Sequence, residues 1–240
     1  MEIHVAFLPG EAGALRGRAA VVIDVIRATT SVLAMLEGGC AEVLVAPTVE
    51  AARRYRDSHP DVLLAGEQGG RAPAGFDFGN SPVAFAQAAL TGRRVVFATT
   101  NGTRAIHAAG EARSVLMACL RNRTAAARAA LAAAAETGRG LSLICSGREG
   151  RFSLDDAYTA GAIIDALAES GGPAALELTD AALAARRLYR DADSEALFRE
   201  TRAGRHVIEI GLGDDLLYCA KIDQSTMVPR LGERVRVVES

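Results

Sequence analysis

Polar side chains of three kinds follow the apolar run VVI near the start of the chain. Asp24 comes directly after the run, Arg27 follows three residues later, and the hydroxyl residues Thr29, Thr30 and Ser31 come next. A helix cap explains a hydroxyl here, but a cap needs neither the acid nor the cation. A buried acid is costly unless it is ion-paired, hydrogen-bonded or bound to a metal. Asp24 is therefore expected in one of these arrangements, with Arg27 as its simplest partner.

Four more polar stretches separate apolar runs from helix-like segments. They are GEQGG at 66–70, GFDFGNSP at 75–82, TTNGT at 99–103 and CSGREGRFSLDD at 145–156. In open α/β sheets, ligands bind beyond the carboxyl ends of the strands, where loops lead into helix N-termini. Each stretch also has an ordinary explanation, because Asn-Gly favours a turn, Ser-Pro starts a helix and Glu67 is either solvated or a ligand of a hard cation.

The last stretch has two chemical interpretations. From Cys145 to Arg151 it fits C-x5-R, the spacing with which Cys-dependent phosphatases surround a phosphate. In the other interpretation, Ser146 and Gly147 are backbone donors to an anion, and Asp156 lies in the first turn of the next helix. The pattern is short, and Ile144 stands where a His is usual in those enzymes. The sequence leaves both interpretations open.

Strand-like and helix-like segments alternate along the chain. Short apolar runs predict strands at 19–25, 42–46, 61–66, 94–100, 114–120, 141–147 and 234–239, and helical patterns lie at 49–57, 83–90, 125–136 and 154–170. This alternation is typical of the α/β class. Since no linker or repeat marks a boundary, residues 1–240 are expected to form a single domain.

Composition excludes several classes of protein. With Lys+Arg 27 against Asp+Glu 29 and a formal charge of -2, no basic excess indicates nucleic acid or an anionic membrane as partner. No apolar run approaches a membrane span, so we expect a cytoplasmic protein. The 4 cysteines are widely spaced, which predicts reduced thiols rather than disulfides or a zinc site. A homodimer is the common default for such a chain.

Taken together and in order, the polar stretches resemble the 2-phosphosulfolactate phosphatase family. The matching blocks are VVIDVIRATTS, Gly66-Glu67, GFDFGNSP, TTNGT, CSGREGRFSLDD and, near the end, DDLLYCAKIDQSTMVP. The resemblance spans residues 3–237. It implies a three-layer α/β/α fold around a mixed sheet and a Mg²⁺-dependent phosphatase that acts on (R)-2-phospho-3-sulfolactate in the coenzyme M route. Asp155 stands where the family often has Glu, which leaves the charge unchanged.

A hypothesis for the site follows from the resemblance and the residues together. Asp24, Glu67 and Asp156 would hold Mg²⁺, and Arg27 would neutralise charge on the phosphoryl group. The expected substrate-binding residues are Thr29, Thr30, Asn80, Ser81, Thr100, Asn101, Gly102, Thr103, Ser146, Gly147 and Arg151, with Arg148 as the alternative to Arg151. They suit a small substrate that carries several anionic groups.

The attacking group is the least determined part of this hypothesis. Water activated by the metal or by an Asp is the first choice, and a Cys145 phosphocysteine intermediate is the second. The substrate could also be another 2-phospho acid. A non-catalytic anion-binding protein is a third possibility from a different class, although the acids that a phosphatase needs are present.

Overall fold

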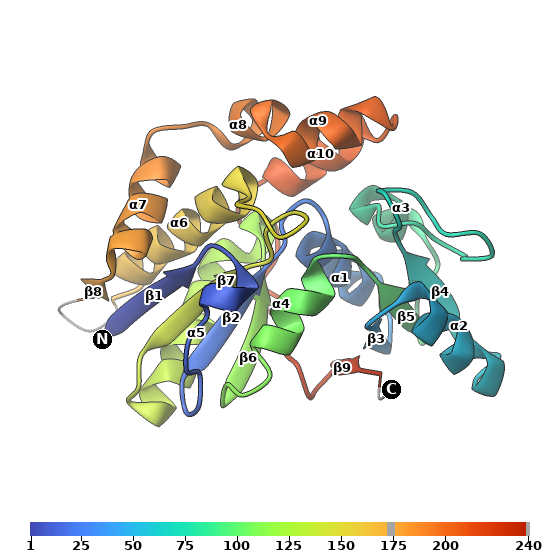
Figure 1. The fold of residues 1–240 in the computed structure, drawn as a ribbon, viewed down its shortest axis with the longest axis horizontal. Helices are drawn as coiled ribbons and strands as arrows, with labels where there is room; N and C mark the ends of the chain where they lie inside the picture. The colour runs from blue at the N-terminus through green and yellow to red at the C-terminus, as the bar shows by residue number, and fades with distance from the viewer. Residues whose placement is uncertain (172–175, 239–240) are drawn as a thin grey trace.

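Two parallel sheets form the framework of the protein (Figure 1). The computed structural model describes residues 1–171 and 176–238. The first sheet has the order β6-β2-β7-β1-β8 and the second the order β4-β5-β3-β9. The strands are β1 (Glu2–Ala6), β2 (Ala19–Ile23), β3 (Glu42–Ala46), β4 (Leu63–Gly66), β5 (Arg94–Ala98), β6 (Ser114–Ala118), β7 (Leu141–Cys145), β8 (Glu177–Leu178) and β9 (Val235–Val237).

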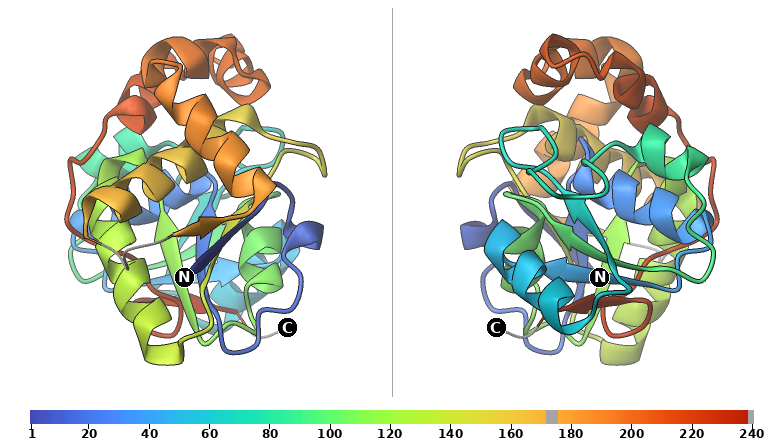
Figure 2. Two further views of the ribbon diagram at one scale, coloured as in Figure 1. Left: turned by 90° about the vertical axis from the view of Figure 1, so that its left-hand side faces the viewer. Right: turned by 90° about the vertical axis from the view of Figure 1, so that its right-hand side faces the viewer.

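Helices cover both faces of each sheet. They are α1 (Ala28–Glu37), α2 (Val49–Ser58), α3 (Pro82–Gln87), α4 (Gly102–Ala108), α5 (Arg123–Thr137), α6 (Leu154–Glu169), α7 (Asp180–Arg190), α8 (Ser194–Glu200), α9 (Arg202–Glu209) and α10 (Gly213–Ala220). Figure 1 and the side views of Figure 2 place α1 and α4 between the two sheets, with α5, α6 and α7 on the outer side of the first.

The buried apolar clusters follow these layers. One cluster fills the space between the sheets and joins Val22 of β2 to Phe97 of β5 through Met35 of α1. A second cluster packs the other face of the first sheet against α5 and α6, and a third packs α2 against the second sheet. All residues of the central strands β2 and β7 are buried, which explains their continuous apolar runs.

The predicted α/β class and three-layer α/β/α packing are confirmed, and the expected mixed sheet is corrected. Every strand pair within the two sheets is parallel among the residues that the structure describes. The carboxyl ends of the strands in a sheet therefore meet at one edge, where the polar loops begin. The expectation that residues 1–240 form a single domain stays a prediction.

The helices α8, α9 and α10 lie together at one end of the molecule, at the top of Figure 1. Helix α10 packs against α3, so this C-terminal group reaches the loops that follow the strands. A search of the described residues finds no helix with the length and hydropathy to span a bilayer.

Candidate active site

Strand register brings the predicted polar loops together. Strands β2 and β7 end side by side at Ile23 and Cys145, so Asp24 and the stretch that begins at Ser146 follow at the same edge. Strands β4 and β5 also end side by side, which places Glu67 beside the TTNGT stretch. The five polar stretches thus lie at the carboxyl edges of the sheets, as an α/β ligand site requires.

Asp24 occupies the turn between β2 and α1 and is only 7% exposed. The Ala28 N–H donates to its Oδ1 at 3.2 Å, and the Thr29 hydroxyl donates to its backbone carbonyl at 2.9 Å. A Cβ built on Gly102 would lie 3.1 Å from Asp24 Oδ2. Glycine at this position therefore lets α4 begin directly against the carboxylate.

Arg27 is buried and held from two sides. Its Nη1 forms an ion pair with Asp215 Oδ2 at 2.7 Å, and its Nη2 donates to the Gly70 carbonyl at 2.9 Å. The Ser81 hydroxyl donates to the other oxygen of Asp215 at 2.6 Å. Asp215, rather than Asp24, is thus the carboxylate that balances Arg27.

Asp156, in the first turn of α6, is fully engaged by hydrogen-bond donors. The Val25 N–H donates to Oδ1 at 3.0 Å, and the Ser146 hydroxyl and the Gly147 N–H donate to Oδ2 at 2.9 and 3.1 Å. These bonds fasten the loop after β7 to the loop after β2. Asp24 and Asp156 therefore lie at the same edge of the sheet.

The acids of this site repel one another. Burial raises the pKa of Asp24 to about 6, the Ala28 N–H opposes that shift, and the charges of Asp155 and Glu67 add to it. Burial also raises the pKa of Asp156 well above its ordinary value, and the charges of Asp155 and Asp24 contribute in the same direction. Perturbed acids of this kind are frequent at functional sites.

A cavity of about 130 Å³ opens at this edge. Six of the predicted site residues line it, namely Asp24, Arg27, Glu67, Asn80, Thr100 and Asn101. Arg148, the predicted alternative to Arg151, also lines the cavity. The sequence hypothesis did not assign the other lining residues to the site, and these are Ile26, Gly69, Gly70, Thr99, Glu149, His206 and Val207. The cavity thus combines carboxylates, guanidinium groups and backbone polar groups in a small volume.

The other predicted binding residues do not line this cavity. They are Thr29, Thr30, Ser81, Gly102, Thr103, Ser146, Gly147 and Arg151. Their polar groups are largely used within the chain, since the Thr30 hydroxyl donates to the Val25 carbonyl at 2.8 Å and the Thr103 hydroxyl to the Thr99 carbonyl at 3.1 Å.

Arg148, and not Arg151, is the arginine of the last loop that reaches the cavity. Arg151 is exposed, and its backbone N–H donates to the Arg148 carbonyl at 2.9 Å in a tight turn. Arg148 Nε is buried and has no hydrogen-bond partner in the described part of the chain. Arg151 does not line the cavity, so Arg148 is the better placed of the two alternatives, and the role of either arginine in binding stays a prediction.

Cys145 is a poor nucleophile in this structure. It is the last residue of β7, is 0% exposed and belongs to the apolar cluster between the first sheet and α6. Burial raises the pKa of its thiol well above the ordinary value, and the charges of Asp156 and Asp155 add to that shift. The thiolate form that a phosphocysteine mechanism needs is therefore strongly disfavoured.

Comparison with known proteins shows the family of this chain. A family model described as 2-phosphosulpholactate phosphatase matches residues 8–234. The chain belongs to this family. A protein of Deinococcus radiodurans named probable 2-phosphosulfolactate phosphatase is 44% identical over 214 residues, which cover 88% of this chain and 87% of the relative. A Thermus thermophilus protein of the same name is 42% identical over 236 residues, which cover 98% of this chain and 96% of the relative.

Membership of the 2-phosphosulpholactate phosphatase family raises the question of whether these residues fit Mg²⁺. No group of three His, Cys, Asp or Glu residues within the described ranges has the geometry of a metal site, so the predicted ligand set of Asp24, Glu67 and Asp156 is not assembled. Asp156 is already engaged by three donors and does not line the cavity. Asp24 and Glu67 do line it, and Mg²⁺ commonly binds one or two carboxylates plus substrate oxygens and water. Two carboxylates at a site with surplus negative charge fit that pattern.

Asp215 is a buried acid beside the cavity that the sequence hypothesis did not assign to the site. It lies in the first turn of α10 and is 2% exposed. The sequence does indicate that Asp215 is buried, because Asp215 stands four residues before Cys219 and so shares the buried face of α10 with it. An acid on an apolar helix face needs a buried partner, and here the partner is Arg27.

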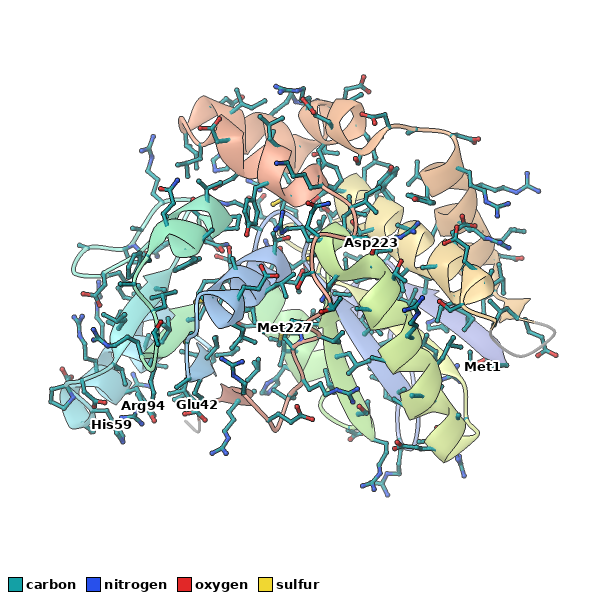
Figure 3. The ribbon with its side chains drawn as sticks, turned by 180° about the vertical axis from the view of Figure 1, so that it is seen from behind. Met1, Glu42, His59, Arg94, Asp223 and Met227 are labelled. Atoms are coloured by element: carbon teal, nitrogen blue, oxygen red, sulfur yellow. The ribbon has the colours of Figure 1, made fainter. Side chains whose placement is uncertain are left out.

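Asp223 and His206 differ in their position relative to the cavity. Asp223 lies beside the first turn of α5, where it accepts hydrogen bonds from the Thr124 N–H at 2.7 Å and from Arg123 Nε at 3.1 Å (Figure 3). It therefore caps that helix and does not close the cavity. His206 of α9 does line the cavity, with Nε2 3.3 Å from the Gly69 carbonyl.

Proposed function

We propose that the protein hydrolyses (R)-2-phospho-3-sulfolactate to sulfolactate and inorganic phosphate, a reaction of the coenzyme M route. The observation that carries this proposal is the cavity that joins the buried acid Asp24 to the fixed guanidinium of Arg27. The names of the related proteins support the choice of substrate. A substrate with phosphate, carboxylate and sulfonate groups requires this mixture of cations and donors.

The protein groups have separate tasks in the proposed reaction. Arg27 is held by Asp215 and Gly70, so its guanidinium meets the phosphoryl oxygens without reorganising. Arg148, with its unpartnered Nε, binds a second acid group of the substrate. Asn80 lines the cavity, and its Oδ1, which has no hydrogen-bond partner in the described chain, accepts a hydrogen bond from a donor group of the bound molecule.

Water is the proposed nucleophile. The water oxygen attacks phosphorus and the bond from phosphorus to the C2 oxygen of the substrate breaks. The Asp24 carboxylate accepts the proton of the water, and the C2 oxygen leaves with a proton from solvent. Mg²⁺, when bound by Asp24 and Glu67, supplies positive charge to the phosphoryl oxygens.

Phosphate release from phosphosulfolactate tests the proposal. The wild-type protein should release phosphate with Mg²⁺ and not after EDTA treatment, and Asp24→Asn should lose about 100-fold or more in kcat/KM. Cys145→Ser should keep its activity. Glu195→Gln, in an exposed ion pair on α8, is the matched control.

Each rival function predicts a different result in this assay. Activity that survives EDTA but disappears in Cys145→Ser would favour a phosphocysteine route over the metal assignment. Tight binding of sulfolactate or phosphate without any turnover would make the protein an anion-binding protein. Equal turnover of phospholactate and phosphosulfolactate would indicate another 2-phospho acid as the natural substrate.

A further inference from the structure

A second cavity of about 450 Å³ adjoins the first. It lies beyond the carboxyl ends of β3, β4 and β5, whereas the acids and loops of the first sheet border the smaller cavity. Ligand sites form at such edges of parallel sheets. The larger cavity therefore lies at the carboxyl edge of the second sheet, and the smaller cavity lies where the loops of both sheets meet.

The two cavities share a wall. Glu67, Thr99 and Thr100 line both, and the Thr100 N–H donates to Glu67 Oε1 at 2.9 Å across that wall. Helix α4 begins at Gly102, in contact with Asp24, and continues along the larger cavity. A small molecule that occupied both cavities would therefore lie against Thr100.

Arg104 and His107 are the cationic and basic side chains of the larger cavity. They stand three residues apart on α4 and so share one face of the helix. Neither forms an ion pair with any residue that the structure describes, in contrast to Arg27, whose charge is balanced by Asp215. Glu50, in the first turn of α2, lines the same cavity and is an acid that an anion must approach.

We propose that the larger cavity is the subsite for the sulfonate of the substrate, with Arg104 as its main ligand and His107 beside it. The inference rests on the proposed function and names the part of the substrate that the second cavity recognises. A sulfonate is ionised at any physiological pH and presents three oxygens, which the planar fork of a guanidinium can meet with two N–H groups. Arg104 has no competing carboxylate partner in the described chain, so its charge is available for this contact.

Kinetics with paired substrates test the subsite. Phosphosulfolactate and 2-phospholactate differ in the sulfonate, so the ratio of their KM values reports on the subsite alone. Arg104→Ala should raise the KM for phosphosulfolactate relative to phospholactate by about tenfold or more, and Arg104→Lys should recover part of the loss. Glu50→Gln should shift the ratio in the opposite direction, because it removes a like charge.

Arg113→Ala is the matched control, because Arg113 is exposed next to β6 and lines neither cavity. It removes the same charge and should leave the ratio unchanged. A ratio that Arg104→Ala leaves unchanged, or that Arg113→Ala changes equally, overturns the subsite.

Calorimetric binding of sulfolactate tests the subsite without any turnover. Affinity should fall about tenfold or more in Arg104→Ala and remain in Arg113→Ala. Failure of phosphate release together with this selective loss would reject the proposed hydrolysis and keep the sulfonate subsite. Equal affinities of the two variants, or no sulfolactate binding by the wild-type protein, would reject the subsite even if phosphate is released.

Discussion

Two groups of buried acids meet at this site, and their charges are balanced differently. Asp215 is 2% exposed and uses both carboxylate oxygens, one for the Arg27 guanidinium and one for the Ser81 hydroxyl. Asp24 and Asp156 are as deeply buried, but they receive hydrogen bonds from neutral donors only. Their like charges raise the pKa of both, after the larger effect of burial.

The difference shows which part of the site the chain completes by itself. The charges of Arg27 and Asp215 balance each other within the chain. The pair connects α10 to the loop after β2, and Ser81 connects it to α3. The group around Asp24 keeps surplus negative charge inside the protein, which costs stability unless a cation balances it. Removing the charge of Asp215 should therefore lower the free energy of unfolding, whereas removing the charge of Asp24 should raise it.

The largest change in stability is expected when the Arg27–Asp215 ion pair is broken. Asp215→Asn leaves the Arg27 guanidinium buried without a counter-charge, so the free energy of unfolding should fall by about 3–5 kcal/mol in urea titrations. Glu195→Gln removes an acid from the exposed Glu195–Arg199 pair and should cost less than about 1 kcal/mol. Similar losses of stability in the two variants would show that the buried Arg27–Asp215 pair contributes no more to stability than an exposed ion pair.

Removing a charge from the other group should stabilise the protein. The pKa of Asp24 is higher in the folded protein, about 6, than its ordinary value of 3.8, so its contribution to stability is present below pH 4 and is lost as the pH rises through 6. In EDTA at pH 7, Asp24→Asn should therefore be more stable than the wild-type protein by about 3 kcal/mol, and the gain should vanish near pH 4.

The control for this prediction is Asp57→Asn on an exposed position of α2. It should change the free energy of unfolding by less than about 0.5 kcal/mol at either pH. A destabilised Asp24→Asn at pH 7 would mean that hydrogen bonds to Asp24 outweigh the cost of burying its charge.

A smaller effect is expected at Ser81. Its hydroxyl donates to Asp215 at 2.6 Å and also accepts the Ala84 N–H at 3.1 Å as the cap of α3. Ser81→Ala removes both bonds but keeps the Arg27 ion pair, so thermal or urea unfolding should reveal a loss of about 1–2 kcal/mol. Ser81→Thr should retain most of that stability, and a loss as large as that of Asp215→Asn would contradict the ranking.

Much of the fold and part of the site could be predicted from the sequence. Apolar runs identified β2 to β7, since strands buried on both faces need continuous apolar residues. β1 was not predicted, because its run EIHVA is short and partly polar, and β8 has only two residues. The division into two sheets is set by which strands pair across long distances, and no local pattern records it.

The site likewise combines residues that the local sequence pattern can place with residues that only tertiary packing brings in. Asp24 and Glu67 follow strand ends directly and Asn101 stands three residues after one, so their convergence is a consequence of parallel strands. Asp215 and His206 come from helices far along the chain, and only tertiary packing brings them to Arg27 and Gly69. The hydroxyls of Thr29, Thr30 and Thr103 donate to backbone carbonyls, which the sequence could not foresee, because a turn uses such groups as readily as a ligand does.

Calorimetric titration of Mg²⁺ at pH 7 tests most directly whether the Asp24 group is built for a cation. The wild-type protein should bind one ion per chain, and Asp24→Asn and Glu67→Gln should each weaken the binding by about tenfold or more while Glu195→Gln leaves it unchanged. Mg²⁺ binding of the same strength in Asp24→Asn and the wild-type protein, or no binding by the wild-type protein, would contradict this account of the site.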